Sequence, residues 1–335
     1  MRHALFLLIV LVFAAPAAEP QDRKIKAGIV FDVGGLGDKS FNDAAHRGLV
    51  RSKDELGAET QYYEPKEPSD RESGLRRFAS EKFDVIVGVG FMFTDDLLKL
   101  AKDFPDLKWA CVDMSVKQGR GGKPVELPKN LVGLKFKEEE GSFLVGAIAG
   151  LVTKTGKVGF VGGMNVPLIH KFEAGFAAGA KHVRPDVQVL SGYAGETPEA
   201  FKDAAKGKSL ALGMYEQGAD IIYHASGQTG RGVFEAAKEK KKFAIGVDSD
   251  QHDEAPGNVL TSMIKRVDLI VFDTIKNVRD GKFEAGYKVF GLKEDGVGFV
   301  YDDRNKALIG EDVHKKVMDL RQEIVDGKIK VPDKK

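Results

Sequence analysis

The sequence is poor in cysteine and tryptophan, with one residue of each among 335. A single cysteine, Cys111, excludes an intrachain disulfide and a cysteine-based metal site. Its neighbours Trp109, Ala110 and Val112 are apolar, which favours a small core residue over a reactive thiol. The GxxxxGK[ST], GxSxG and HExxH motifs are also missing. No motif therefore points to a P-loop nucleotide site, a hydrolase nucleophile or a zinc protease, and we expect no cofactor and no metal.

A charge excess of either sign is absent as well. The chain has 51 Lys and Arg against 50 Asp and Glu, a formal net charge of +1. Basic and acidic residues interleave along the predicted helices, and the basic run at 238–242 (KEKKK) is typical of a solvated helix end. No basic stripe suits a nucleic acid. We expect a monomer that binds a small molecule and no nucleic acid.

Long apolar runs are scarce, and the first one lies at the N-terminus. Residues 1–18 combine Arg2, an apolar segment from Leu5 to Ala14 and small residues around Pro16, which is typical of a secretory signal peptide. The segment is shorter than the roughly 20 apolar residues that span a bilayer. No lipobox cysteine stands at the cleavage site, so we expect a mature protein that is soluble in the periplasm.

Apolar strand-like and amphipathic helix-like segments alternate along the rest of the chain. This pattern favours parallel α/β units, and its two successive runs predict two doubly wound domains. The predicted strands of the first run are 26–31, 59–63, 85–89, 109–112 and 131–136, with helices 40–56, 70–80 and 94–104. Those of the second are 158–161, 187–191, 221–224, 243–247 and 259–263, with helices 144–152, 167–183, 198–217 and 232–240.

The remaining segments predict that the chain crosses between the domains three times. An amphipathic helix over 267–279 is expected to return to the first domain, and the tail with strand 297–301 and helix 310–326 to pack on the second. The predicted N-terminal lobe comprises residues 24–137 and 262–290. The predicted C-terminal lobe comprises 138–261 and 291–335. Three connections of this kind would form a hinge.

Polar and aromatic residues gather where the predicted strands end. In a doubly wound sheet these ends face one crevice. The first half supplies Asp32 before a glycine turn (Gly34, Gly35, Gly37), and then the following residues: Phe41, Asn42, Phe91 and Asp113. The second half supplies His224, Gly227 and Asp248, with Lys265 just beyond the last strand. The turn lacks a phosphate-binding lysine motif, which favours a flat, hydroxylated ligand over a dinucleotide.

Several of these positions have more than one interpretation. Phe91 and His224 either contact a ligand or belong to the core, and the 227–232 segment (GQTGRG) either binds an anion or forms a tight turn. The carboxylates suit acid–base chemistry or hydrogen bonds to ligand hydroxyls. Because no activated nucleophile accompanies them, binding is the better interpretation, and we do not expect an enzyme.

The chain resembles the basic membrane protein family of substrate-binding proteins of ABC transporters, which includes purine nucleoside receptors. The resemblance extends over almost the whole mature chain in one order. Its motifs are 32–42 (DVGGLGDKSFN), 88–95 (GVGFMFTD), 139–147 (EEGSFLVGA), 158–164 (VGFVGGM), 224–234 (HASGQTGRGVF), 245–251 (IGVDSDQ) and 261–265 (TSMIK).

The resemblance implies a type I periplasmic binding-protein fold, a small-molecule ligand and a membrane permease as partner. It implies that a purine stacks on Phe41 while Asp32 and Asn42 help bind the base. It further implies that Asp248 and Lys265 hold the ribose hydroxyls. A second aromatic ring is expected over the other face of the base, yet the 222–227 region offers only Tyr223 and His224. The alternatives are another flat or polyhydroxylated ligand, such as a flavin or a sugar, and a nucleoside-cleaving enzyme.

Overall fold

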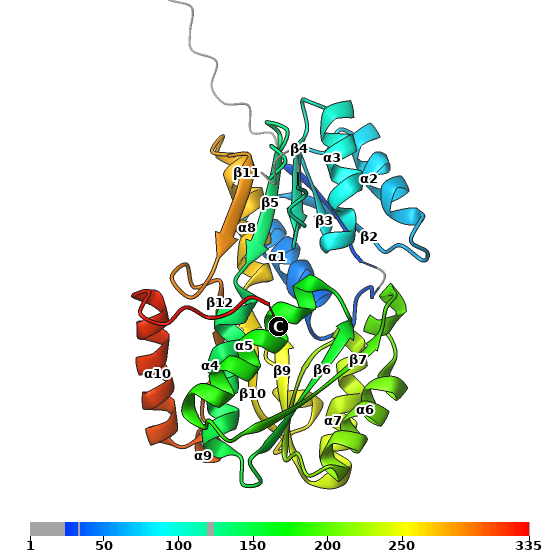
Figure 1. Cartoon of the computed structure of the whole chain (residues 1–335). Coiled ribbons are helices and arrows are strands. Elements are labelled where there is room, and N and C mark those ends of the chain that lie inside the picture. Colours follow the sequence, from blue (N-terminus) through cyan, green and yellow to red (C-terminus); the bar gives the residue numbers. More distant parts are fainter. Residues whose placement is uncertain (1–23, 33, 119–123, 335) are drawn as a thin grey trace, which may run out of the picture.

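A computed structural model describes residues 24–32, 34–118 and 124–334. It contains two lobes, each built on a six-stranded sheet, and the two sheets lie one above the other in Figure 1. The predicted signal segment, residues 1–18, lies outside the described residues. Within the described residues, no helix has the length and apolar content needed to span a membrane.

The first lobe has an all-parallel sheet in the order β11-β5-β4-β3-β1-β2. Helices α1 and α8 pack on one face of it, and α2 and α3 pack on the other. The central strands are buried on both faces, as the continuous apolar run Val85–Val89 predicts. The elements are β1 (Lys26–Val30), α1 (Phe41–Leu56), β2 (Glu59–Tyr63), α2 (Asp70–Ser80), β3 (Val85–Val89), α3 (Thr94–Asp103), β4 (Lys108–Val112), β5 (Leu131–Phe136), α8 (Val267–Arg279) and β11 (Gly286–Phe290).

The second lobe has the order β12-β10-β9-β8-β6-β7, in which only the edge strand β12 is antiparallel to its neighbour. Helices α4 and α5 cover one face, and α6 and α7 cover the other. The elements are α4 (Glu138–Val152), β6 (Lys157–Met164), α5 (Pro167–Val183), β7 (Gln188–Gly195), α6 (Ala204–Glu216), β8 (Ile221–Ala225), α7 (Gly230–Lys240), β9 (Phe243–Asp248), β10 (Val259–Lys265), β12 (Val297–Phe299), α9 (Lys306–Ile309) and α10 (Glu311–Val325).

The glycine-rich apolar segment that begins the second lobe forms α4, which is buried as expected. Glycine lets α4 approach α5 backbone to backbone. A Cβ at Gly146 would lie 2.1 Å from the carbonyl oxygen of Phe176, and one at Gly179 would lie 2.0 Å from that of Phe143. Since real Cβ atoms essentially never come this close, the small residues of both helices are required by the packing.

The chain passes between the sheets after β5, after β10 and after β11, so three segments form the hinge. The predicted boundary between residues 261 and 262 is wrong, because β10 stays in the second sheet until Lys265. The hinge segments are hydrogen-bonded to one another. The amide of Lys137 donates to Phe290 O at 3.0 Å, and that of Arg266 donates to Gly296 O at 2.9 Å.

Two further expectations need correction. The predicted helix over 198–217 divides into a 3-10 turn, Pro198–Phe201, and α6, because the Asp203 carboxylate caps a new helix by accepting from the amide of Lys206 at 2.8 Å. Strand β11, at an edge of the first sheet, was not predicted. Cys111 lies in the core, where burial raises the pKa of its thiol, as its apolar neighbours predict.

Candidate ligand-binding cleft

A cavity lies between the lobes, where the carboxyl ends of the two sheets face each other. All of the predicted site residues except His224 line it. They are Asp32, Phe41, Asn42, Phe91, Asp113, Gly227, Asp248 and Lys265. The topology explains the convergence, because β1, β3 and β4 of the first lobe and β8, β9 and β10 of the second end on this side.

On the first lobe, the loop between β1 and α1 is held by Asp38. Its buried carboxylate accepts the backbone N–H groups of Ser40 at 2.9 Å and Asn42 at 2.8 Å, which fixes the start of α1. With the start of α1 fixed in this way, Phe41 and Asn42, the first residues of the helix, line the cavity. The side-chain oxygen of Asn42 is buried and accepts no hydrogen bond from the described residues. A ligand N–H group is therefore a suitable partner for it.

Lys265 lines the cavity and is almost completely buried. Its Nζ lies 2.6 Å from Asp113 Oδ2 and 3.0 Å from Glu138 Oε1. The rings of Phe41, Phe136 and Phe172 surround the ammonium, with their centroids 4.8 to 5.5 Å from Nζ. Burial acts to lower the pKa of Lys265, but Asp113 and Glu138 outweigh it, so the pKa is raised and the group stays charged.

On the second lobe, Asp248 ends strand β9 with a φ of 64°, an uncommon conformation for a residue with a side chain. Burial raises the pKa of its carboxyl to about 6 despite the nearby Lys265. The carboxylate accepts a hydrogen bond from the Ser40 hydroxyl across the cleft. A strained, partly titrating carboxylate of this kind is more typical of a binding position than of a purely structural one.

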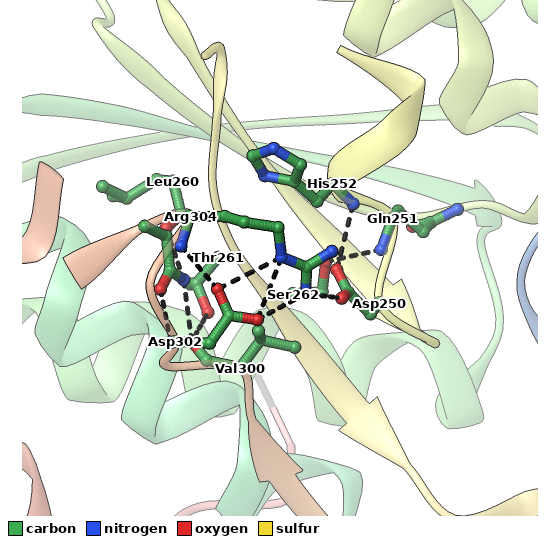
Figure 2. Close-up of polar contacts among 10 residues, drawn as sticks. Asp250, Gln251, His252, Leu260, Thr261, Ser262, Val300, Asp302 and Arg304 are labelled. Carbon is green, nitrogen blue, oxygen red and sulfur yellow. Dashed lines mark hydrogen bonds and ion pairs between the residues drawn. The ribbon is translucent and has the colours of Figure 1, made fainter. Parts of the chain in front are cut away.

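The loop that follows Asp248 is anchored on the side away from the cavity, and Figure 2 shows these contacts. The Asp250 carboxylate pairs with the Arg304 guanidinium, which also binds Asp302. The backbone N–H of Gln251 donates to Ser262 Oγ at 3.0 Å. These contacts hold the loop that presents Asp248, and no local sequence signal indicates them, because Arg304 lies 54 residues further along the chain.

The two lobes contact each other directly through hydrogen bonds. Arg47 Nη2 donates to Ser249 Oγ at 2.7 Å, and Gln228 Nε2 donates to Gly34 O at 2.8 Å. Arg231 donates to Gly37 O from the same side of the second lobe. Together with the Ser40–Asp248 hydrogen bond, these contacts show that the structure is a closed form.

His224 does not line the cavity, and its predicted place in the site is corrected. Its ring is completely buried and packs edge-on against Phe234, with ring centroids 5.1 Å apart. Nε2 lies 3.1 Å from Gln251 Oε1, an acceptor, so Nε2 carries the hydrogen and Nδ1 accepts from Ser226 Oγ at 3.3 Å. Burial lowers the pKa to about 4. His224 is thus a neutral core residue, one of the two interpretations that the sequence allowed.

Sequence reasoning missed the aromatic residues of the second lobe. Phe172, on α5, and Phe201, in the 3-10 turn after β7, both line the cavity, whereas Tyr223 is buried and lies 3.1 Å from Ser142 Oγ. The sequence does contain a signal for Phe172. The strand–helix unit β6–α5 repeats the arrangement of β1–α1, so residues in the first turns of α5 should face the cleft, as Phe41 does at the start of α1.

The fold and the cleft define a two-lobed solute-binding protein, closed around a site that both lobes build. The model of the PnrA-like ABC transporter substrate-binding proteins (Bmp) matches residues 25–335. The chain belongs to this family, whose members are substrate-binding proteins rather than enzymes. Such proteins act outside the cytoplasm, take a small-molecule ligand and work with a permease.

Individual relatives agree with this assignment. The chain is 38% identical over 338 residues to a "CD4+ T-cell-stimulating antigen" of Listeria innocua, covering 94% of this chain and 90% of the relative. It is 35% identical over 332 residues to the "ABC transporter nucleoside-binding protein BmpA" of Lactococcus lactis, covering 92% and 90%. A crystal structure of a solute-binding protein of an ABC transporter system from Aeropyrum pernix aligns with a TM-score of 0.82 and 31% identity, covering 92% and 94%.

Proposed function

We propose that the protein is a periplasmic receptor that binds a purine nucleoside between its lobes and delivers it to an ABC permease. The observation that carries the proposal is the composition of one closed cavity. Phe41 enters it from the first lobe and Phe172 and Phe201 from the second, beside Lys265 and several carboxylates. Aromatic rings from both lobes suit a flat base, and charged groups suit a hydroxylated sugar. The nucleoside-binding relative supports the same ligand class.

In this proposal the base occupies the aromatic part of the cavity. Phe41 stacks on one face of the purine, and Phe172 or Phe201 supplies the ring for the other face. Stacking contributes roughly 1–3 kcal/mol per base and tolerates many bases. Discrimination must therefore come from the edge of the base, where the buried side-chain oxygen of Asn42 accepts a ligand N–H and Asp32 is a neighbouring acceptor.

The ribose lies between Asp248 and Lys265, with Gly227 allowing the backbone to come close. Gly227 has a φ of 56°, which glycine adopts without strain. Four carboxylates, those of Asp32, Asp38, Asp113 and Asp248, line the cavity against the single ammonium of Lys265 among the described lining residues. This charge disfavours a phosphate group, so the proposed ligand is a nucleoside rather than a nucleotide.

Asp248→Asn is expected to reduce the preference for ribonucleosides over 2′-deoxyribonucleosides by about 10- to 150-fold. The variant replaces a charged acceptor by a neutral amide, and a hydrogen bond to a charged group contributes about 1.5–3 kcal/mol. Calorimetric titration with guanosine and 2′-deoxyguanosine measures the ratio. Asp253→Asn, at an exposed position of the same loop, is the matched control and should leave the ratio unchanged. An unchanged ratio in Asp248→Asn contradicts the assigned role.

The same variant should stabilise the protein without ligand, in a pH-dependent way. The folded-state pKa of Asp248 is raised from 3.8 to about 6, so its ionised form opposes folding above pH 6. That penalty shrinks as the pH falls from 6 toward 4 and is gone below about 3.8, where the carboxyl is protonated in both the folded and the unfolded chain. At pH 7.5, Asp248→Asn should therefore raise the free energy of unfolding by about 1–3 kcal/mol, and by little at pH 4.

A further inference from the structure

We propose that Glu138 and Lys171 are positioning residues that orient Lys265 in the cleft and connect it to the hinge. The inference rests on the proposed function, in which Lys265 binds the ribose. Neither Glu138 nor Lys171 lines the cavity. Both belong to a chain of alternating charges, mostly buried, that extends from Asp113 of the first lobe through Lys265 and Glu138 to Lys171 and Glu139 of the second.

Glu138 is the central member of this chain. It is the first residue of α4, directly after the first hinge crossing, and its side chain is only 1% exposed. One of its oxygens, Oε1, lies 3.0 Å from Lys265 Nζ, and the other pairs with Lys171 Nζ. Burial acts to raise the pKa of Glu138, but the two ammonium groups outweigh it and the pKa falls below its usual range. The carboxylate is therefore charged and held between two lysines.

The position of Lys265 makes this pairing relevant to the ligand. Lys265 is the last residue of β10, next to the second hinge crossing, so its contact with Glu138 links two of the three hinge segments. An ammonium has three N–H donors. Within the described part of the chain its ion-pair partners are Asp113 and Glu138. Only the contact with Asp113 has hydrogen-bond geometry, so at least one donor is left for the cavity. With Glu138 neutralised, the ammonium loses one of the two anions that set this orientation.

Lys171 fixes the carboxylate from the other side. It comes from α5 of the second lobe and donates to the carbonyl oxygen of Phe136, the last residue before the first crossing. It also pairs with Glu139 Oε2 at 3.1 Å. Lys171 thus holds the hinge residues 136–139 against α5, the helix that carries the cavity residue Phe172. A ligand that touches Lys265 and Phe172 is connected through this chain to the hinge.

The test measures how strongly inosine is preferred over 2′,3′-dideoxyinosine, which lacks the ribose hydroxyls. Glu138→Gln keeps the size of the side chain and should reduce this preference at least tenfold, with little change in the affinity for dideoxyinosine. Lys171→Met should act in the same direction, and Lys171→Arg should restore most of the preference. Glu140→Gln is the matched control, since Glu140 contacts the hinge residues Lys137 and Leu292 but not Lys265.

If Glu138→Gln lowers the affinities for inosine and for dideoxyinosine by the same factor, the role of Glu138 is merely structural and the proposal is overturned. Unchanged affinities for both ligands would overturn it as well. A second measurement needs no ligand. The effects of Glu138→Gln and Lys265→Met on the free energy of unfolding should be strongly non-additive, and additive effects would overturn the link between the two residues. If the wild type binds no nucleoside, the proposed function fails, whereas the link between Glu138 and Lys265 is still decided by this double-mutant cycle.

Discussion

Replacing Lys265 by methionine is expected to lower the free energy of unfolding by about 3–5 kcal/mol, the usual result of removing one partner from a buried ion pair. The variant leaves the carboxylates of Asp113 and Glu138 in the core without the ammonium that lies 2.6 and 3.0 Å from them. Methionine fills a similar volume, so the loss reflects charge rather than packing. Urea unfolding at pH 8, followed by circular dichroism, measures it.

A matched control separates burial from ion pairing. Lys276 also lies 2.6 Å from a carboxylate, that of Asp280, but its side chain is 42% exposed. Lys276→Met should therefore change stability by at most about 1 kcal/mol. The loss of unfolding free energy in Lys265→Met should also become smaller as the pH falls toward 5. The reason is that the unpaired carboxylates of Asp113 and Glu138 take up protons more readily in the folded than in the unfolded state. Equal effects of the two variants would contradict the role assigned to Lys265.

Phe41→Ala is expected to weaken purine nucleoside binding by about 5- to 150-fold, which corresponds to the roughly 1–3 kcal/mol that stacking on one aromatic side chain contributes. Phe41 is the first residue of α1, is only partly buried and lines the cavity. Its ring also lies 5.1 Å from Lys265 Nζ, so truncation removes a contact of the ammonium as well. Calorimetric titration with inosine measures the change.

Two other substitutions at the same position show whether the aromatic face is responsible. Phe41→Trp keeps a π surface and should retain most of the affinity, whereas Phe41→Leu keeps only apolar bulk and should lose most of it. An unchanged affinity for inosine in Phe41→Ala would contradict the proposed stacking of the base on Phe41.

Much of the fold and of the site could be predicted from sequence because both follow from local rules. Strand–glycine–helix units such as 26–42 define a parallel sheet, and the carboxyl ends of its strands define where a ligand lies. Asp32, Asp113 and Asp248 each directly follow a predicted strand (26–31, 109–112 and 243–247), so this rule alone places them at the cleft. The same rule places Lys265 at the cleft, because it lies just beyond the predicted strand 259–263.

The rest could not be predicted because it depends on contacts between distant segments. His224 ends a strand like the others, but Gly230 comes so close that a Cβ there would lie 2.1 Å from its ring, and the side chain is enclosed in the core. Phe201 lines the cavity from a 3-10 turn that ends just before the helix cap at Asp203, where the sequence predicts one continuous helix. Glu138, next to the hinge, pairs with Lys171 of α5, which lies 33 residues further along the chain, and no spacing indicates that pairing.

Calorimetric titration decides whether the cleft binds purine nucleosides. The mature protein is titrated with adenosine, guanosine, inosine, inosine 5′-monophosphate, riboflavin and free sugars, including ribose. We expect saturable binding of at least one purine nucleoside, much weaker binding of the monophosphate, and no measurable heat from riboflavin or the sugars. Binding of sugars alone, or of riboflavin alone, would contradict the claim.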